Sequence, residues 1–76
     1  MVTVYTQPRC PACRTTKSAL DAREIEYNEV DITEDSDALE LVLSKGFKQA
    51  PVVITDEDSW SGHQPDKINS LQKEHE

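Results

Sequence analysis

Two cysteines stand three positions apart near the start of the chain, in the segment Cys10-Pro11-Ala12-Cys13. Thiols at this spacing can exchange disulfides or hold a metal ion, and in both uses the thiolate is the reacting form. A disulfide between them closes a very small loop, so it adds little stability through the unfolded chain. Because the chain has no other cysteine, the pair predicts reactive chemistry rather than a structural disulfide.

The residue after the first cysteine indicates where the pair lies. Pro11 suits the first position of a helix, where its missing N–H costs nothing, so Cys10 would cap that helix. The free N–H groups and the helix dipole favour a thiolate there, by about 0.3–1 kcal/mol and up to ~2 kcal/mol in sheltered geometry. Positive side chains lie on both sides of the same segment, with Arg9 before it and Arg14 and Lys17 after it. We therefore expect a lowered pKa for Cys10, which attacks the target disulfide, and a more sheltered Cys13, which resolves the mixed disulfide.

Metal binding is the alternative use of the two thiols. Zinc usually takes four ligands, and the chain adds only His63 and His75 as further histidine or cysteine candidates. A closed zinc site and an iron–sulfur cluster shared between two chains are therefore weaker hypotheses than redox chemistry, and we expect no metal and no cofactor. His63 is alone in a predicted loop, where we interpret it as an exposed or packing residue rather than a proton carrier.

Charge and hydropathy exclude several classes of protein. The net charge of −7 argues against nucleic-acid binding, which uses Lys and Arg to neutralise phosphates. Eight acidic residues and no basic ones lie between positions 24 and 40, as expected for a solvated face. The start of the chain lacks the pattern of a signal peptide, and no apolar run approaches the ~20 residues of a membrane span. We expect a cytoplasmic, monomeric protein without a membrane or nucleic-acid partner.

Periodicity predicts seven elements within one domain, 1–76, with 72–76 as a frayed tail. The first three are a strand at 2–6, a helix at about 11–23 and an edge strand at 25–32. A second helix follows, which Thr33 caps and which stops at 45–46. An antiparallel pair of strands is predicted at 51–55 and around 59–60, followed by a short helix from Pro65 that holds Ile68 and Leu71. The first two strands flank a helix, so we expect them to be parallel. This order, with the cysteines between the first strand and first helix, is that of the thioredoxin fold, an α/β domain with a four-stranded mixed sheet flanked by three helices.

In the second predicted helix, acidic residues gather at the start and apolar residues form a stripe further along. Its predicted first turn contains Glu34, Asp35 and Asp37, which the helix dipole favours. Its predicted buried stripe is Ala38, Leu39, Leu41, Val42 and Leu43.

Pro51 opens a predicted strand, and the default for any bond before proline is trans, with cis at about 5–6%. If the fold is thioredoxin-like, however, this position is the cis-proline beside the cysteines. The backbone of Ala50 would then be free to pair with an extended substrate segment.

Three segments of the chain resemble NrdH-redoxins, the glutaredoxin-like proteins that behave functionally as thioredoxins. They are the strand at 2–6 leading to Cys10-Pro11-Ala12-Cys13, the segment Gln49-Ala50-Pro51-Val52-Val53, and Trp60-Ser61-Gly62-His63-Gln64-Pro65-Asp66-Lys67-Ile68. The resemblance implies that NADPH supplies electrons through thioredoxin reductase and that the chain passes them to a class Ib ribonucleotide reductase. It implies Cys10 as nucleophile, Cys13 as resolving thiol and Pro51 as the cis-proline. The residues expected to face a partner are Arg9, Pro11, Ala12, Gln49, Ala50, Pro51, Trp60, Ser61 and Gly62. For Trp60 the alternative is a core residue in a chain with few aromatics, and its neighbours favour a contact role as well.

Two other functions compete with this prediction. A glutathione-dependent glutaredoxin commonly carries Thr-Val-Pro and Gly-Gly at the positions where this chain has Gln49-Ala50-Pro51 and Ser61-Gly62. A metal-binding module would use the two thiols as ligands, and it lacks a convincing third and fourth ligand.

Overall fold

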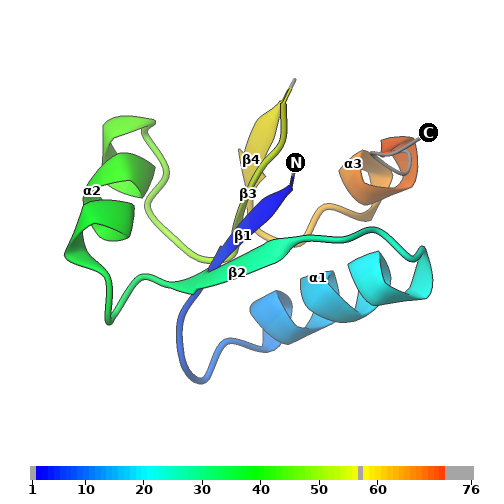
Figure 1. The fold of residues 1–76 in the computed structure, drawn as a ribbon, viewed down its shortest axis with the longest axis horizontal. Helices are drawn as coiled ribbons and strands as arrows, with labels where there is room; N and C mark the ends of the chain where they lie inside the picture. The colour runs from blue at the N-terminus through cyan, green and yellow to red at the C-terminus, as the bar shows by residue number, and fades with distance from the viewer. Residues whose placement is uncertain (1, 57, 72–76) are drawn as a thin grey trace.

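The computed structural model describes residues 2–56 and 58–71, which form four strands and three helices (Figure 1). In chain order these are β1 (Thr3–Thr6), α1 (Pro11–Ala22), β2 (Asn28–Asp31), α2 (Ser36–Ser44), β3 (Val52–Ile54), β4 (Ser59–Ser61) and α3 (Pro65–Ser70). The predicted order of elements is confirmed, with a shorter β2 and a later start of α2. Within the described ranges, no helix is both long and apolar enough to cross a membrane. The tail predicted at 72–76 lies outside the described residues.

The strands form one mixed sheet in the order β2-β1-β3-β4. β1 pairs in parallel with β2, and β3 pairs antiparallel with β4, as the sequence predicted. The structure adds the antiparallel pairing of β1 with β3. Val4 of β1 lies opposite Val53 of β3, which in turn lies opposite Trp60 of β4. The edge strand β2 exposes Asn28 and Glu29, and polar side chains of this kind discourage pairing with other molecules.

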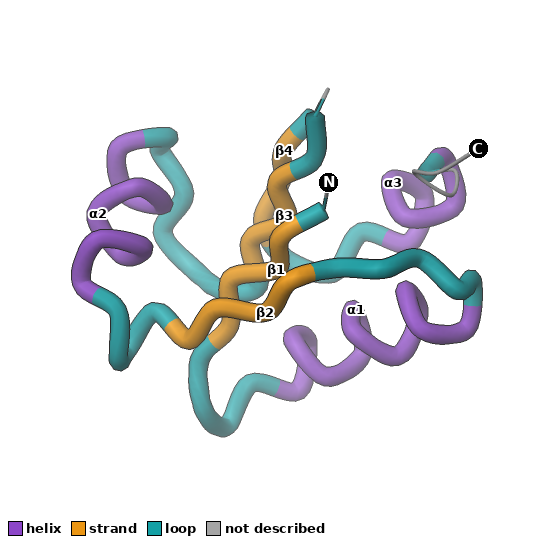
Figure 2. The backbone as a smooth tube through the Cα atoms, viewed as in Figure 1, coloured by secondary structure: helices purple, strands orange, loops and turns teal. Residues whose placement is uncertain are grey.

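Helices cover both faces of the sheet, with α1 and α3 on one face and α2 on the other (Figure 1). Successive strand residues point to opposite faces. Val4 therefore packs with Leu20 of α1 and Ile68 of α3, whereas the next residue, Tyr5, packs with Val42 of α2. The loop from β1 to α1, which contains the first cysteine, leaves the sheet at one end (Figure 2). The observed arrangement is the predicted thioredoxin-like fold.

The start of α2 corrects the sequence prediction. Asp35, not Thr33, caps the helix, and its carboxylate accepts a backbone N–H of the first turn over 3.1 Å. Thr33 instead donates its N–H and hydroxyl to the carboxylate of Asp31, over 2.8 and 2.6 Å. This local turn occupies the residues before the helix, so Glu34 precedes it and only Asp37 lies in its first turn.

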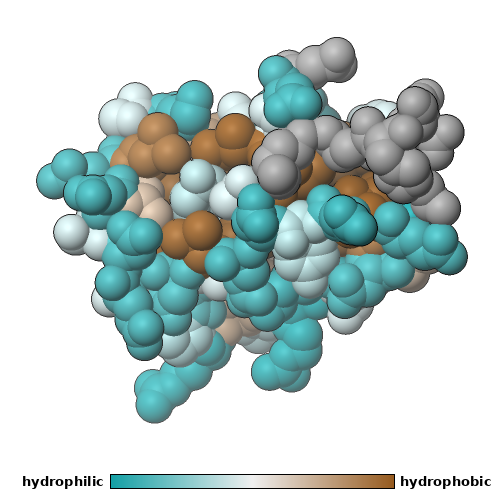
Figure 3. All heavy atoms as spheres, viewed as in Figure 1, coloured by the Kyte–Doolittle hydropathy of each residue, from teal (hydrophilic) through white to brown (hydrophobic). Residues whose placement is uncertain are grey.

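The buried stripe of α2 is also narrower than predicted. Ala38 and Val42, four positions apart, are buried against the sheet. Leu39, Leu41 and Leu43 are 37%, 40% and 53% exposed, because at 100° per residue they lie to either side of that stripe. Figure 3 shows hydrophobic atoms gathered between α2 and the strands, with hydrophilic side chains below them.

Candidate active site

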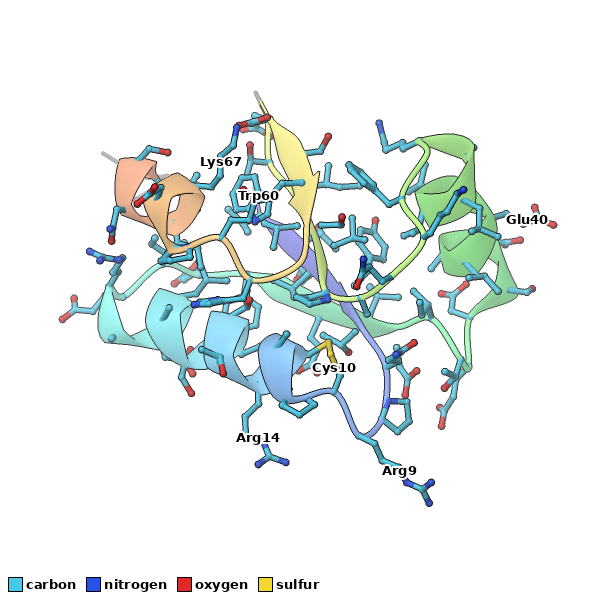
Figure 4. The ribbon with its side chains drawn as sticks, turned by 180° about the vertical axis from the view of Figure 1, so that it is seen from behind. Arg9, Cys10, Arg14, Glu40, Trp60 and Lys67 are labelled. Atoms are coloured by element: carbon cyan, nitrogen blue, oxygen red, sulfur yellow. A yellow bond between two sulfur atoms is a disulfide. The ribbon has the colours of Figure 1, made fainter. Side chains whose placement is uncertain are left out.

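Cys10 and Cys13 are joined by a disulfide at the start of α1, with their Cα atoms 5.2 Å apart (Figure 4). Cys10 caps the helix and Pro11 is its first residue, as predicted. The backbone N–H of Cys13 donates to the sulfur of Cys10 over 3.1 Å. The sulfur of Cys10 thus accepts one of the N–H groups that a helix leaves unpaired in its first turn.

The two cysteines differ in their access to solvent. Cys10 is partly exposed, whereas Cys13 is only 3% exposed. Between them, Pro11 is exposed and Ala12 is half-buried. A large disulfide partner can therefore approach the sulfur of Cys10 directly, while the sulfur of Cys13 is screened by the fold.

The Ala50–Pro51 peptide bond is cis, as expected for this fold. Pro51 itself is fully buried, and its carbonyl oxygen accepts the backbone N–H of Gly62 over 2.8 Å. The pairing of Tyr5 with Val52 places this turn beside the end of β1, from which the cysteine loop leaves the sheet. The structure thus brings together the three segments that carry the resemblance.

Ala50 lies in the turn before β3 and is itself 9% exposed. Within residues 2–56 and 58–71, neither the N–H nor the carbonyl of Ala50 takes part in a recorded hydrogen bond. Gln49 before it is exposed, and Ser61 and Gly62 across the turn are partly exposed. Both backbone groups of Ala50 can therefore pair with an extended chain.

Trp60 fills the core, which confirms one of the two roles considered for it, and its ring does not contribute to this surface. Its side chain is 3% exposed and packs in the cluster that contains Val4, Leu20 and Ile68. The strand alternation explains this placement, because the centre of β4 points into the core while Ser59 and Ser61 on either side are partly exposed. Of the Trp60-Ser61-Gly62 segment, the last two residues reach the surface.

A cavity of about 360 Å³ lies beside the disulfide and is lined by both cysteines and by five charged residues. The charged residues are Arg9, Arg14, Lys17, Glu29 and Asp31. Lys17 and Glu29 form an ion pair over 2.8 Å. The pKa of Asp31 is held below its ordinary value, chiefly by the hydrogen bond from the hydroxyl of Thr33 and to a smaller extent by the one from its backbone N–H. The sequence expectation of positive charge beside Cys10 is confirmed, and the two carboxylates are an addition to it.

Thr6 is a further residue of this cavity that sequence reasoning missed. It is 5% exposed and its hydroxyl donates to the carboxylate of Glu29 over 3.2 Å. A polar residue at a buried strand position was the signal that could have indicated it.

His63 is partly exposed, and its Nδ1 lies 3.1 Å from the hydroxyl of Thr16, which is fully buried in α1. The histidine therefore joins the loop before α3 to the helix that carries the cysteines, in agreement with a packing role.

Groups of three or more His, Cys, Asp or Glu side chains placed to hold a metal ion do not occur within residues 2–56 and 58–71.

Comparisons with known proteins agree with this geometry. A family model described as Glutaredoxin matches residues 2–60. The glutaredoxin-like protein NrdH of Salmonella typhimurium is 40% identical over 70 residues, which are 92% of this chain and 86% of the relative. The protein of the same name from Lactococcus lactis subsp. cremoris is 38% identical over 71 residues, 93% of this chain and 99% of the relative. A solved structure of the glutaredoxin-like protein NrdH-redoxin from Escherichia coli, described for its thioredoxin-like activity profile, matches with a TM-score of 0.91 at 38% identity and covers 93% of both chains.

Proposed function

The chain belongs to the glutaredoxin family as a glutaredoxin-like redox protein of the NrdH type, and we propose that it carries electrons from thioredoxin reductase to a class Ib ribonucleotide reductase. It is a thiol–disulfide oxidoreductase with Cys10 and Cys13 as its redox pair. The choice of partners is carried by one observation, the similarity over 93% of both chains to an NrdH-redoxin described for thioredoxin-like activity. The proposal includes a location in the cytoplasm, a reducing compartment.

In the proposed reaction, the thiolate of Cys10 attacks one sulfur of the target disulfide, and the other target sulfur leaves as a thiolate. The thiol of Cys13 then loses its proton to solvent and attacks the sulfur of Cys10 in the mixed disulfide. The second target thiolate leaves, two electrons have moved to the target, and Cys10 and Cys13 are oxidised. The partial exposure of Cys10 and the burial of Cys13 support this division of roles.

The remaining site residues have proposed roles in partner binding. The backbone of Ala50 pairs with the extended target segment, and Gln49, Ser61 and Gly62 border it. Arg9, Pro11 and Ala12 are the sequence neighbours of Cys10, and their proposed contact is with the target segment next to the reacting disulfide. Gln49-Ala50-Pro51 and Ser61-Gly62 differ from the Thr-Val-Pro and Gly-Gly of glutathione-using glutaredoxins, which supports thioredoxin reductase as the electron source.

The test follows NADPH oxidation during reduction of a disulfide substrate, in parallel with thioredoxin reductase or with glutathione and glutathione reductase. We expect turnover with thioredoxin reductase, and turnover with glutathione alone would contradict the proposal. A second assay supplies a class Ib ribonucleotide reductase with this chain as its only dithiol. Deoxyribonucleotide formation that depends on the chain is the expected result.

The cysteine roles are tested with Cys10→Ser and Cys13→Ser. The first variant should lose turnover, because it has no attacking thiol. The second should accumulate a mixed disulfide with the target, visible as an added mass that dithiothreitol removes. Full dithiol reductase activity of Cys13→Ser would show that the assignment of roles is wrong.

A further inference from the structure

The surroundings of the disulfide differ in charge from the rest of the molecule. Three cations and two carboxylates line the cavity beside the cysteines, whereas the whole chain has a net charge of −7. From residue 2 to residue 20 the chain contains no aspartate or glutamate. The disulfide therefore opens on a small positive region within an acidic protein.

Two arginines form the outer part of this region. Arg9 immediately precedes Cys10, and Arg14 lies one helical turn after it. The backbone N–H of Arg14 donates to the backbone carbonyl of Cys10 over 3.2 Å. Both side chains are exposed and extend outward on the side of the molecule where the disulfide lies (Figure 4). Arg9 has a φ of 60°, a conformation that is unfavourable for residues other than glycine. Both arginines thus line the cavity beside the disulfide that a target must approach, with their side chains directed to solvent (Figure 4).

Neither guanidinium has a partner in the part of the chain that the structure describes. No ion pair or side-chain hydrogen bond of Arg9 or Arg14 occurs within residues 2–56 and 58–71. Lys17, the third cation of the cavity, differs because it is paired with Glu29 over 2.8 Å. The guanidinium groups of Arg9 and Arg14 are therefore available to an external acceptor, and the planar guanidinium fork fits a carboxylate with two parallel hydrogen bonds.

We propose that Arg9 and Arg14 recognise aspartate or glutamate side chains next to the target disulfide, so that the protein prefers partners whose redox-active segment is locally acidic. The proposal rests on the thiol–disulfide exchange activity proposed above and adds a substrate preference to it. It concerns a short segment only, because a partner that is acidic over a large area would be repelled by the net charge of −7.

The distance over which charges act decides whether the two arginines or the net charge of the whole protein governs the preference among target disulfides. At an ionic strength of about 0.1 M, exposed charges farther apart than about 10 Å are largely screened. A carboxylate beside the target disulfide lies next to Arg9 and Arg14 during the reaction, whereas most of the acidic residues lie on other elements. Near physiological salt the two arginines should therefore dominate, and the preference should weaken as salt rises.

The test uses three short peptides that contain one disulfide and differ only in the two residues that flank it, which are aspartate, asparagine or lysine. The protein is reduced beforehand and mixed with each peptide, and a single turnover is followed. Each rate constant is divided by the rate constant of the same peptide with dithiothreitol, because flanking charges alter the reactivity of the disulfide itself. We expect the normalised rate to be about three- to tenfold higher for the aspartate peptide than for the asparagine peptide, the range that two exposed ion pairs supply.

Arg9→Gln and Arg14→Gln each remove one positive charge beside the cysteines, and Lys45→Gln removes one from the exposed end of α2 as the matched control. We expect the aspartate-to-asparagine ratio to fall by about two- to threefold in each arginine variant and to stay at the wild-type value in Lys45→Gln. Arg9→Lys, which keeps the charge at the same backbone conformation, should keep part of the ratio. Far-UV circular dichroism and the melting temperature of each variant show independently that the protein is folded.

An equal loss of rate with all three peptides would overturn the proposal, because the arginines would then act on the thiolate of Cys10 alone. An unchanged ratio in the arginine variants, or a ratio that does not respond to salt, would also overturn it. Failure of the wild-type protein to reduce any of the peptides would instead contradict the exchange activity itself.

Discussion

The backbone N–H of Gly62 donates to the carbonyl oxygen of Pro51 over 2.8 Å, and this bond joins the loop after β4 to the start of β3. Gly62 has a φ of 79°, in the left-handed region that residues with a side chain rarely adopt. The turn before β3, which carries Ala50, is therefore held in place from the other end of the hairpin. The two segments act as one surface beside the cysteines.

Gly62→Ala should weaken this surface, and Gly46→Ala provides a matched control. Gly46 has a φ of 90° at the end of α2, and an added Cβ meets no atom within 4 Å at either position. We expect both variants to lose about 1 kcal/mol of unfolding free energy, since only the backbone conformation is penalised. Reduction of a protein disulfide should slow in Gly62→Ala and not in Gly46→Ala. Equal rates in the two variants would show that the Gly62 turn does not affect partner binding.

Trp60 should act through stability rather than through contact with a partner. Its ring is 3% exposed, and its Nε1–H has no hydrogen-bond partner among the described residues. Trp60→Ala should cost about 3–5 kcal/mol, a large part of the stability of so small a domain. Trp60→Phe removes a buried, unpaired donor, so we expect it to remain within about 1 kcal/mol of the wild type in chemical denaturation. A loss in Trp60→Phe as large as in Trp60→Ala would show that the Nε1–H has a stabilising partner.

Local signals were enough to predict the elements and the reactive end of the site. Pro11 after Cys10 predicts a helix start, because the ring fixes φ and the missing N–H costs nothing there. The structure confirms the cap and the first turn. Pro51 shows the limit of such signals, because alone it favours trans and only the inferred fold predicted the observed cis bond.

Predictions failed where tertiary packing decides the outcome. The apolar run of α2 predicted burial of Leu39 and Leu43, and the helix contacts the sheet with only Ala38 and Val42. For Trp60 both a core role and a partner contact were considered, and the register of β4 turns its ring into the core. The five apolar residues of α2 occupy more than one face of the helix, so the run alone does not decide which of them contact the sheet.

The ion pair between Asp58 and Lys67 predicts a pH dependence of stability. Lys67 Nζ lies 2.9 Å from Asp58 Oδ2 and joins α3 to the turn before β4 (Figure 4). The pKa of Asp58 lies below its ordinary value, chiefly because its carboxylate accepts a hydrogen bond from Lys67 and to a smaller extent because it accepts one from the backbone N–H of Ser59. The charged carboxylate is thus favoured in the folded state, so its contribution is present above the unfolded pKa of about 4 and is lost as pH falls through the folded value.

Asp58→Asn should therefore lower the melting temperature at pH 7, and its difference from the wild type should shrink below about pH 4. Because both groups are exposed, we expect a small difference that salt reduces. Glu40→Gln removes one negative charge from the exposed side of α2 and controls for net charge (Figure 4). A difference that grows as pH falls would contradict the assigned role of the carboxylate.

The amide of Ala50 should become protected when a target is bound. In the free protein its N–H donates no recorded hydrogen bond within residues 2–56 and 58–71, and backbone pairing with an extended target segment would supply an acceptor. The mixed disulfide of Cys13→Ser with a target peptide holds that segment in place. We expect hydrogen exchange at Ala50 to slow by about tenfold in this complex, since a net hydrogen bond of about 1–1.5 kcal/mol corresponds to that change. The Phe47 N–H, which already donates to Val42 over 3.3 Å, is the internal reference and should keep its exchange rate. Unchanged exchange at Ala50, in a sample that mass spectrometry shows to be fully cross-linked, would exclude strand pairing at this position.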